Sequence, residues 1–182
     1  SCNTLAWFKS IKVDITGEKI KGPQHIMRAH GIETVYGLGG LHGCITPGIY
    51  ESDDENVIVT ADVASYYPNL AIKNKWSPAQ LPNDEFCELY EWFFIERKKY
   101  DKKNPLNYLF KIILNSTYGL SKSLHSFLYD PELTFRITVN GQLLLTMLYE
   151  TVMLRIPEAL PIMQNTDGLE FKIPRTKLEE FN

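Results

Sequence analysis

The dipeptide Asn104-Pro105 constrains the fold most strongly, because it separates two stretches with helical periodicity. Proline interrupts a helix from within but is favoured at the first helical position. We therefore expect one helix over residues 83–103, capped by Asn83, and a second from Pro105 to about Lys122. Helices joined this tightly form an antiparallel hairpin. Aromatic side chains mark one face of the first helix, namely Phe86, Tyr90, Phe93 and Tyr100.

Strands are expected on both sides of this helical pair. Residues 57–61, Val-Ile-Val-Thr-Ala, are short, apolar and β-branched, which predicts a buried strand. Residues 160–174 have two β-like arms around a polar turn at 165–168, which is typical of a hairpin. Residues 136–155 predict a third helix, whose inward face we expect to consist of Ile137, Leu144, Met147, Leu148 and Val152. This irregular order predicts an α+β fold with an antiparallel sheet.

The composition excludes several classes of protein. The chain has 182 residues, 44% of them hydrophobic, which suffices for about one folded domain and excludes global disorder. A net charge of −3 argues against a basic protein that coats DNA, so any nucleic-acid contact has to come from a local patch or from a site that uses acid for chemistry. No apolar run approaches the roughly 18 residues that span a bilayer, and the N-terminus does not resemble a signal peptide. We therefore expect a cytoplasmic protein without a membrane partner.

The cysteines and histidines indicate no metal site. Cys2, Cys44 and Cys87 are an odd number without metal-ligand spacing, so we expect free thiols in a reducing compartment. The four histidines are scattered along the chain, which argues against bound zinc. The chain begins without Met, and we expect it to be a segment of a longer protein.

Two carboxylates follow or interrupt apolar β-like segments. Asp62 ends the strand at 57–61, where a carboxylate is costly unless it is paired or binds a metal. Asp62 could instead cap a short helix, and Asp167 could simply be a turn residue. If both lie at the ends of neighbouring strands, they form a hard oxygen site of the kind that magnesium prefers. Two such ions can clamp the attacking and leaving oxygens of a phosphoryl transfer.

The second expected helix carries a polar strip. Its members recur at spacings of four, three and four and fall within an arc of roughly 60°; they are Lys111, Asn115, Tyr118 and Lys122. Such a strip is either a solvated face or a surface for phosphates and bases. Arg97 shares the arc of Tyr90 on the first helix, so it should face the partner helix or a site. Lys98, Lys99, Lys102 and Lys103 mostly project elsewhere, as a solvated face or a loose backbone-contact patch.

Three segments, in this order, resemble the polymerase motifs A, B and C of family B DNA polymerases. Asp62-Val63-Ala64-Ser65-Tyr66-Tyr67-Pro68 resembles motif A, Asp-x-x-Ser-Leu-Tyr-Pro. Residues 111–119, Lys-Ile-Ile-Leu-Asn-Ser-Thr-Tyr-Gly, match motif B, Lys-x-x-x-Asn-Ser-x-Tyr-Gly, at every defined position. Asn165-Thr166-Asp167-Gly168 resembles motif C, Asp-Thr-Asp-Ser, with Asn in place of the first Asp. The glycine-rich residues 39–43 are similar to segments in phage-type members of the family.

The resemblance implies a set of catalytic and DNA-binding residues. Asp62 and Asp167 would be the catalytic carboxylates and, with the Val63 carbonyl, would bind two Mg²⁺ ions, for which Mn²⁺ is a possible substitute. Tyr118 and Gly119 would pack against the templating base pair. Asn165 cannot neutralise a cation as a carboxylate does, although an amide oxygen can still coordinate one. We therefore expect activity, with an altered metal preference as a possible consequence.

The resemblance also implies a nucleotide-binding set. The backbone amides of Ser65 and Tyr66 would contact the triphosphate. Tyr67 would underlie the sugar and exclude a ribose 2′-hydroxyl. Lys111 and Arg97 would grip the triphosphate, and Asn115 would support the nucleotide.

The expected activity is that of a DNA-directed DNA polymerase acting in viral or phage DNA replication on dNTPs and primer–template DNA. The resemblance implies a palm formed by residues 1–82 and 123–182 and fingers formed by the helical hairpin 83–122. We expect the isolated segment to bind primer–template poorly and to be inactive alone. One alternative is a non-catalytic, nucleic-acid-binding polymerase remnant, which Asn165 favours. A two-metal nuclease is another, against which the triphosphate-gripping motif B argues.

Overall fold

The computed structural model describes residues 2–13 and 22–182, with the Cys2 side chain left undescribed. Over this part of the chain the fold is mixed α/β, with a six-stranded antiparallel sheet and six α-helices. This arrangement is compatible with the expected α+β class. The chain forms two compact units, which we describe separately: the first contains residues up to 13, 22–64 and 141–182, and the second contains residues 65–140.

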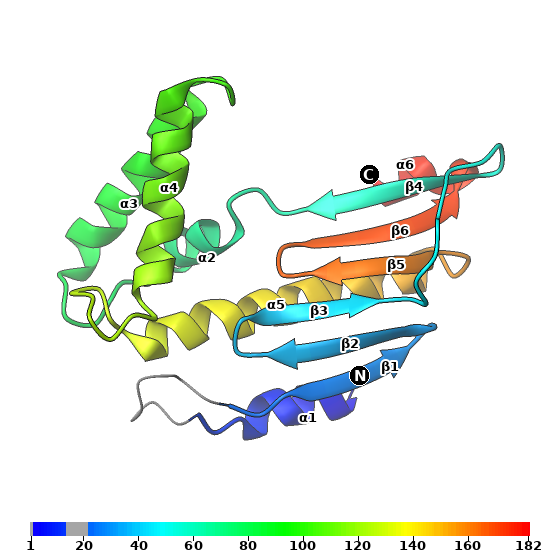
Figure 1. The fold of residues 1–182 in the computed structure, drawn as a ribbon, viewed down its shortest axis with the longest axis horizontal. Helices are drawn as coiled ribbons and strands as arrows, with labels where there is room; N and C mark the ends of the chain where they lie inside the picture. The colour runs from blue at the N-terminus through cyan, green and yellow to red at the C-terminus, as the bar shows by residue number, and fades with distance from the viewer. Residues whose placement is uncertain (1, 14–21) are drawn as a thin grey trace. The chain divides into compact units, whose positions relative to one another are not determined.

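The first unit is built on the sheet, whose strand order is β1-β2-β3-β5-β6-β4 (Figure 1). The expected strand at 57–61 is β4, and the expected hairpin at 160–174 is β5 and β6. The strands are β1 (His25–Ala29), β2 (Ile32–Gly37), β3 (Gly40–Cys44), β4 (Asn56–Asp62), β5 (Leu160–Asn165) and β6 (Gly168–Pro174). Strand β4 pairs with β6 over its whole length, from Asn56 opposite Pro174 to Asp62 opposite Gly168.

The glycine-rich segment forms the tight β2–β3 hairpin, with Gly37 opposite Gly40. Gly40 has a φ of +144°, a conformation that other residues rarely adopt. A Cβ on Gly43 would lie 2.8 Å from the Glu33 carbonyl oxygen, so a side chain would separate the two strands. The local reason for these glycines is therefore close backbone pairing.

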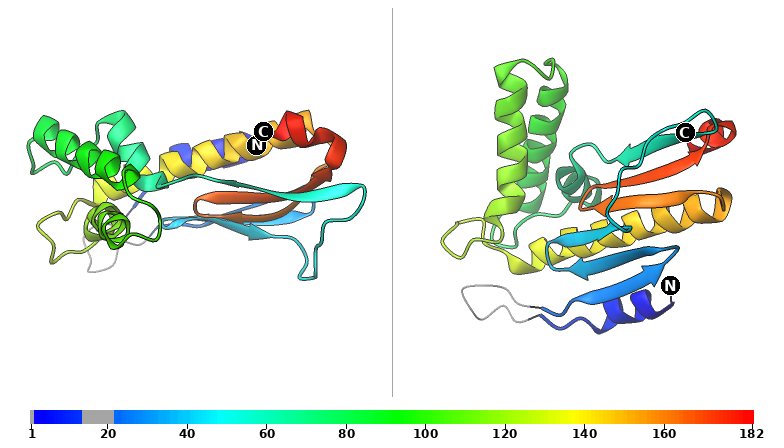
Figure 2. Two further views of the ribbon diagram at one scale, coloured as in Figure 1. Left: turned by 90° about the horizontal axis from the view of Figure 1, so that it is seen from above. Right: turned by 45° about the vertical axis from the view of Figure 1, so that its right-hand side comes forward.

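Helices cover one face of the sheet (Figure 2). On β6, Leu169, Phe171 and Ile173 are fully buried, whereas the alternate residues are only half-buried. Helix α5 (Pro131–Arg155) packs on this buried face, where the Tyr149 and Phe171 rings stack with centroids 6.1 Å apart. Helix α1 (Cys2–Ser10) covers the same face near β1 and β2. A short 3₁₀ turn (Arg175–Lys177) and α6 (Leu178–Phe181) end the chain.

The buried face of α5 differs from the expectation at two positions. Ile137 and Val152 are buried as expected, but Leu144 is 47% exposed and Met147 is 62% exposed. The reason is that α5 also turns polar side chains toward the sheet: Gln142 donates to the Gly37 carbonyl at 2.8 Å, and the hydroxyls of Tyr36 and Thr146 bond at 3.1 Å. These bonds set the rotation of the helix and leave Leu144 and Met147 outside.

The second unit contains α2 (Tyr66–Asn74), α3 (Asn83–Lys98), α4 (Pro105–Leu120) and the first turns of α5. The expected antiparallel hairpin is α3–α4: the Tyr90 hydroxyl donates to the Leu114 carbonyl at 2.7 Å, and the Phe93 and Phe110 rings lie 6.0 Å apart. Asn104 caps α4 through a bond from the Leu106 amide, with Pro105 at the first helical position.

Two details of the hairpin differ from the expectation. Asn83 does not cap α3, because the helix begins there and Pro82 precedes it. Helix α3 also ends at Lys98 rather than near residue 103, since the chain turns through Asp101, whose carbonyl accepts from the Asn104 amide at 2.9 Å. None of the described helices is both long and apolar enough to cross a membrane.

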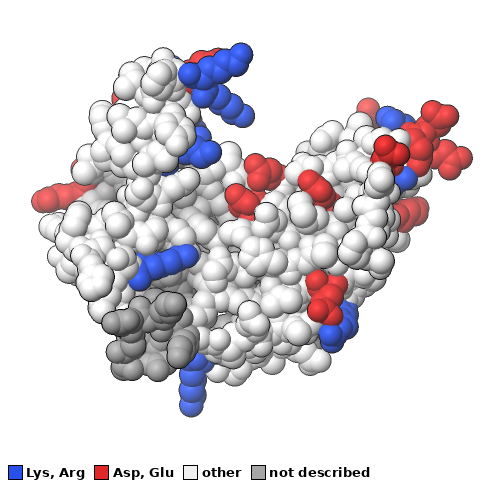
Figure 3. Space-filling model, in the orientation of Figure 1, with Lys and Arg blue, Asp and Glu red and all other residues white. Residues whose placement is uncertain are grey.

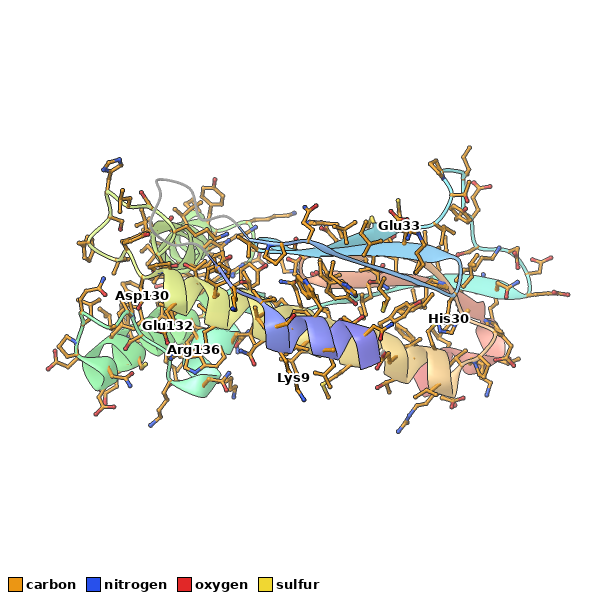
Figure 4. The ribbon with its side chains drawn as sticks, turned by 90° about the horizontal axis from the view of Figure 1, so that it is seen from below. Lys9, His30, Glu33, Asp130, Glu132 and Arg136 are labelled. Carbon is orange, nitrogen blue, oxygen red and sulfur yellow. The ribbon has the colours of Figure 1, made fainter. Side chains whose placement is uncertain are left out.

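The start of α5 is fixed by Asp130 (Figure 4). The carboxylate of this buried residue accepts from the Leu133 amide and from the Ala79 amide, each at 2.9 Å. It therefore satisfies an open helix N-terminus and also holds the chain that leads into α3. This capping signal explains why α5 begins at Pro131, five residues before the expected start at about residue 136.

We expect Asp130→Ala to lower the free energy of unfolding by about 2 kcal/mol, because it removes a cap and also leaves the part-buried bond of the Ala79 amide without its acceptor. Glu132→Ala is the matched control: its ion pair with Arg136 is exposed and should contribute at most about 0.5 kcal/mol. Urea unfolding measures both. Equal stability of the two variants would contradict this role of Asp130.

Candidate functional site

The two predicted catalytic acids lie at the same end of neighbouring strands in the first unit. Asp62 is the last residue of β4 and pairs with Gly168, the first residue of β6. Asp167 precedes Gly168 in the two-residue turn between β5 and β6, and its carbonyl accepts from the Val63 amide at 2.9 Å. This bond extends the β4–β6 ladder past the end of β4. Both acids are exposed, which leaves their carboxylates open to a ligand.

The structure removes one alternative for Asp62. The helix that begins within motif A is α2, and its N-cap is Ser65 rather than Asp62. Asp62 therefore has no capping role, although Asp167 does occupy a tight turn. A Cβ built on Gly168 would lie 3.3 Å from Oδ1 of Asp62, so the Asp62 carboxylate extends over the position where Gly168 has no side chain.

The donor set at these strand ends suits a hard divalent cation. Asp62 and Asp167 offer carboxylate oxygens and Val63 offers a carbonyl, which are the ligand types that Mg²⁺ takes before water and phosphate complete its shell. Within residues 2–13 and 22–182, no group of three or more His, Cys, Asp or Glu side chains is arranged to hold a metal. A site with one or two carboxylates does not need such a group.

Sequence analysis missed the partner of Asn165. The Asn165 Oδ1 accepts from its neighbour's backbone amide, Thr166 N, at 2.8 Å and lies 3.1 Å from Nδ1 of His42 on β3. The Thr166 hydroxyl is a third, longer contact at 3.4 Å. Nothing in the sequence connects residue 42 with residue 165, because their proximity depends on the pairing of β3 with β5.

In the second unit, the structure brings Ser65 together with Arg97. The Arg97 Nη1 donates to the Ser65 hydroxyl at 2.7 Å, and its Nε donates to Oδ1 of Asn107 at 3.3 Å. Asn107 is buried and donates in turn to the carbonyls of Arg97 and Tyr100. Arg97 thus faces the partner helix, as expected. Asn107, which sequence analysis missed, holds the guanidinium in place.

Ser65 adopts an unusual backbone conformation. Its φ of +50° and ψ of +49° are left-handed, a region that costs a non-glycine residue about 1–2 kcal/mol. Backbone strain of this kind often occurs at functional sites. Ser65 N-caps α2 without a side-chain capping bond. Because Ser65 stands at the N-terminus of α2, the amides that follow it lie at the positive end of the helix dipole, where anions bind favourably.

Tyr67 and Tyr118 form an aromatic pair with centroids 4.3 Å apart. Burial, and secondarily the charge of an ionised Tyr67, raise the pKa of Tyr118 far above its usual value. Burial also raises the pKa of Tyr66 to about 12. The Tyr118 hydroxyl therefore stays protonated, and it is buried without a hydrogen-bond partner among the described residues.

Lys122 lies over the Tyr118 ring, with its Nζ 4.3 Å from the centroid. Burial lowers the pKa of Lys122. Lys111, Asn115 and Gly119 are exposed on α4, and the side chains of Lys111 and Asn115 form no hydrogen bond to a described residue. The polar strip is therefore mixed: its Tyr118 is buried in the unit, whereas Lys111 and Asn115 remain available to a ligand.

Charge is unevenly distributed within each unit (Figure 3). In the first unit, strand register assigns Glu33, Asp62 and Glu170 to the face of the sheet that the helices leave uncovered, where acidic side chains are visible. The same face carries Arg28, which pairs with Glu33, and Lys172. Of these three acids, Asp62 and Glu170 lack a basic partner among the described residues. In the second unit, basic side chains gather at the tip of the α3–α4 hairpin, where Lys98, Lys99, Lys102 and Lys103 occur. The carboxylates at the end of β4 suit a cation, and the basic tip suits phosphates.

No known protein family matches the sequence, and none of the curated proteins matches it. Among solved structures, the chain is similar to the family B DNA polymerase from the hyperthermophilic archaeon Pyrobaculum calidifontis. The two share 17% sequence identity with a TM-score of 0.44, over 76% of this chain and 25% of that polymerase. The chain thus spans about a quarter of the length of this structure.

The strain at Ser65 can be measured with two variants. Ser65→Ala and Ser65→Gly both remove the hydroxyl that Arg97 contacts, but only glycine relieves the left-handed conformation. We expect the glycine variant to be more stable than the alanine variant by about 1 kcal/mol in urea unfolding. An alanine variant as stable as the glycine variant would exclude the left-handed conformation at this position.

Proposed function

We propose that this chain is the catalytic core of a family B-like, DNA-directed DNA polymerase, of the kind that replicates viral or phage DNA. The observation that carries the proposal is the meeting of motif A and motif C at one sheet end, where the Val63 amide bonds to the Asp167 carbonyl. The order of the two motifs along the sequence does not by itself require these segments to be neighbours in space. Their adjacency is what a site with two carboxylates needs.

In this proposal, Asp62, Asp167 and the Val63 carbonyl hold two Mg²⁺ ions, for which Mn²⁺ is a substitute. Bound magnesium supplies charge stabilisation for the attacking and leaving oxygens of the phosphoryl transfer. The primer 3′-oxygen forms a bond to the α-phosphorus, the bond from that phosphorus to the leaving pyrophosphate breaks, and the hydroxyl proton passes to solvent. The protein contributes mainly position and charge.

The second unit would bind the incoming dNTP. The Ser65 and Tyr66 amides lie at the start of α2, where the helix dipole favours phosphate. Arg97 is already oriented by Asn107, so it loses little side-chain entropy on binding a phosphate. Lys111 adds a point charge and Asn115 supports the nucleotide.

Tyr67 would underlie the sugar and exclude a ribose 2′-hydroxyl, while Tyr118 and Gly119 would pack against the templating pair. The contact between the Tyr67 and Tyr118 rings supports this assignment, because each ring limits the movement of the other. The proposed palm comprises residues 1–82 and 123–182, of which Ser1 and 14–21 lie outside the described residues, and the proposed fingers are residues 83–122.

A second candidate is a nucleic-acid-binding protein without catalysis. Asn165 favours it, because its oxygen already accepts from Thr166 and His42 and carries no charge. Both candidates bind primer–template DNA, and only the polymerase extends it. Binding without dNTP incorporation would support the second candidate.

We expect Asp62→Ala or Asp167→Ala to lower the rate of primer extension by roughly a thousandfold in the intact protein with magnesium, because metal-based charge stabilisation amounts to several kcal/mol. Asp54→Ala is the matched control, since this exposed acid lies just before the opposite end of β4. It should extend primers at the wild-type rate. Wild-type extension by Asp167→Ala would remove Asp167 from the mechanism.

Lys111→Ala should raise the KM for dNTP by about tenfold, because a charge-assisted hydrogen bond to phosphate contributes roughly 1.5 kcal/mol or more. The affinity for primer–template should change by less than about twofold. Lys9→Ala on α1 is the control for the loss of one exposed positive charge. Steady-state extension at varied dNTP concentration measures the effect, and equal KM values in the two variants would contradict the role of Lys111.

A further inference from the structure

Four residues form a row across the uncovered face of the sheet in the first unit. Asp62 on β4 pairs with Gly168 on β6, and Gly168 pairs with Asn165 on β5. On β3, Gly43 pairs with Gln164, so the same register places His42 opposite Asn165. The neighbours Leu41 and Leu169 are fully buried under the helices, so the row lies on the opposite face. From β3 to β4 across the sheet, the row consists of His42, Asn165, Gly168 and Asp62.

The orientation of the Asn165 amide follows from its backbone partner. The Thr166 N is a backbone amide that can only donate, so the atom it meets at 2.8 Å is the side-chain oxygen. This oxygen is only an acceptor, so Nδ1 of His42 at 3.1 Å has to carry a hydrogen and donate. Neutral His42 is consequently the Nδ1–H tautomer, a state set by the pairing of β3 with β5.

These bonds leave Asn165 with only hydrogen-bond donors to offer, whereas a carboxylate at this position would offer only acceptors. An amide oxygen has two lone pairs, and the Thr166 amide and His42 occupy both. The group that remains is Nδ2, whose two hydrogens meet no acceptor among the described residues. Magnesium binds oxygen rather than a protonated nitrogen, so Asn165 in this orientation is not a metal ligand.

We propose that Asn165 is a hydrogen-bond donor to an oxygen of the DNA backbone, and that His42 is the positioning residue that keeps its amide in this orientation. The inference rests on the proposed function, because it needs primer–template DNA on the uncovered sheet face. Gly168 has no side chain between Asn165 and the Asp62 carboxylate, two strand spacings or about 10 Å away along the row. A phosphodiester next to a cation held by the acids would be within reach of Nδ2.

The first experiment measures DNA binding without turnover. A fluorescein-labelled primer–template duplex is titrated with the intact protein in magnesium and without dNTP. Asn165→Ala and His42→Ala should each weaken binding by about fivefold to tenfold, because each loses or misorients one hydrogen bond to an anionic group. His42→Asn should restore binding to within about twofold of wild type, since its side-chain amide can donate from near the position of Nδ1.

Cys44→Ala is the matched control for His42, because Cys44 is exposed on the same strand and the same face. It should bind DNA as the wild type does. Urea unfolding of each variant separates loss of folding from loss of the bond. Equal binding by wild type, Asn165→Ala and His42→Ala would overturn the proposal.

The second experiment distinguishes a donor from a metal ligand. If Asn165 donates to DNA, Asn165→Ala leaves the magnesium concentration for half-maximal primer extension unchanged, and Asn165→Asp weakens DNA binding further by adding a negative charge. A severalfold rise in the magnesium requirement of Asn165→Ala, or tighter DNA binding by Asn165→Asp, would overturn the inference.

Nitrogen NMR of the His42 ring tests the structural premise independently of any activity. A protonated Nδ1 and an unprotonated Nε2 at a pH where His42 is neutral support it, and the opposite tautomer overturns it. A wild-type protein that shows the Nδ1–H tautomer and binds DNA but does not extend primers would end the polymerase proposal. It would leave the donor role of Asn165 standing.

Discussion

The β4–β6 ladder is the constraint on which the candidate site depends. Seven consecutive pairs fix β4 against β6, and the Val63 amide adds one more bond beyond the last pair. Since side chains alternate along a strand, a slip of one residue would turn Asp62 to the covered face. The buried residue of β4 opposes that slip, because Val59, which lies opposite Phe171 in the core, would turn to the uncovered face. Core packing therefore determines where the acids lie.

A different kind of interaction, hydrogen bonding by buried polar side chains, fixes the structure of the second unit. Its hairpin is held by hydrogen bonds from buried polar side chains to backbone carbonyls, including those of Tyr90 and Asn107. A buried polar group is stabilising only when its partners are in place, so these bonds specify one packing of α3 on α4. Asn107 also fixes the Arg97 side chain, because its Oδ1 accepts from the Nε of Arg97. Its guanidinium is fixed before any ligand arrives, which lowers the entropic cost of binding an anion.

Local chemistry explains which features were predictable from the sequence. The Asn104-Pro105 cap and the β-branched run at 57–61 act on neighbouring residues, and both gave elements close to those observed. The inward face of α5 was predicted only in part, because bonds of Gln142 and Thr146 to the sheet override apolar periodicity. The contact between His42 and Asn165 was not predictable, since it arises from the pairing of strands far apart in the chain.

The position of β4 at the sheet edge also has a kinetic consequence. Its partner β6 lies near the end of the described chain, so β4 leaves the ribosome long before β6 exists. At translation rates of roughly 5–20 residues per second, the apolar segment Val-Ile-Val waits on the order of ten seconds without a partner. An unpaired β-branched strand is a template for aggregation. Nascent chains should thus depend on chaperone protection during synthesis more than the finished fold does.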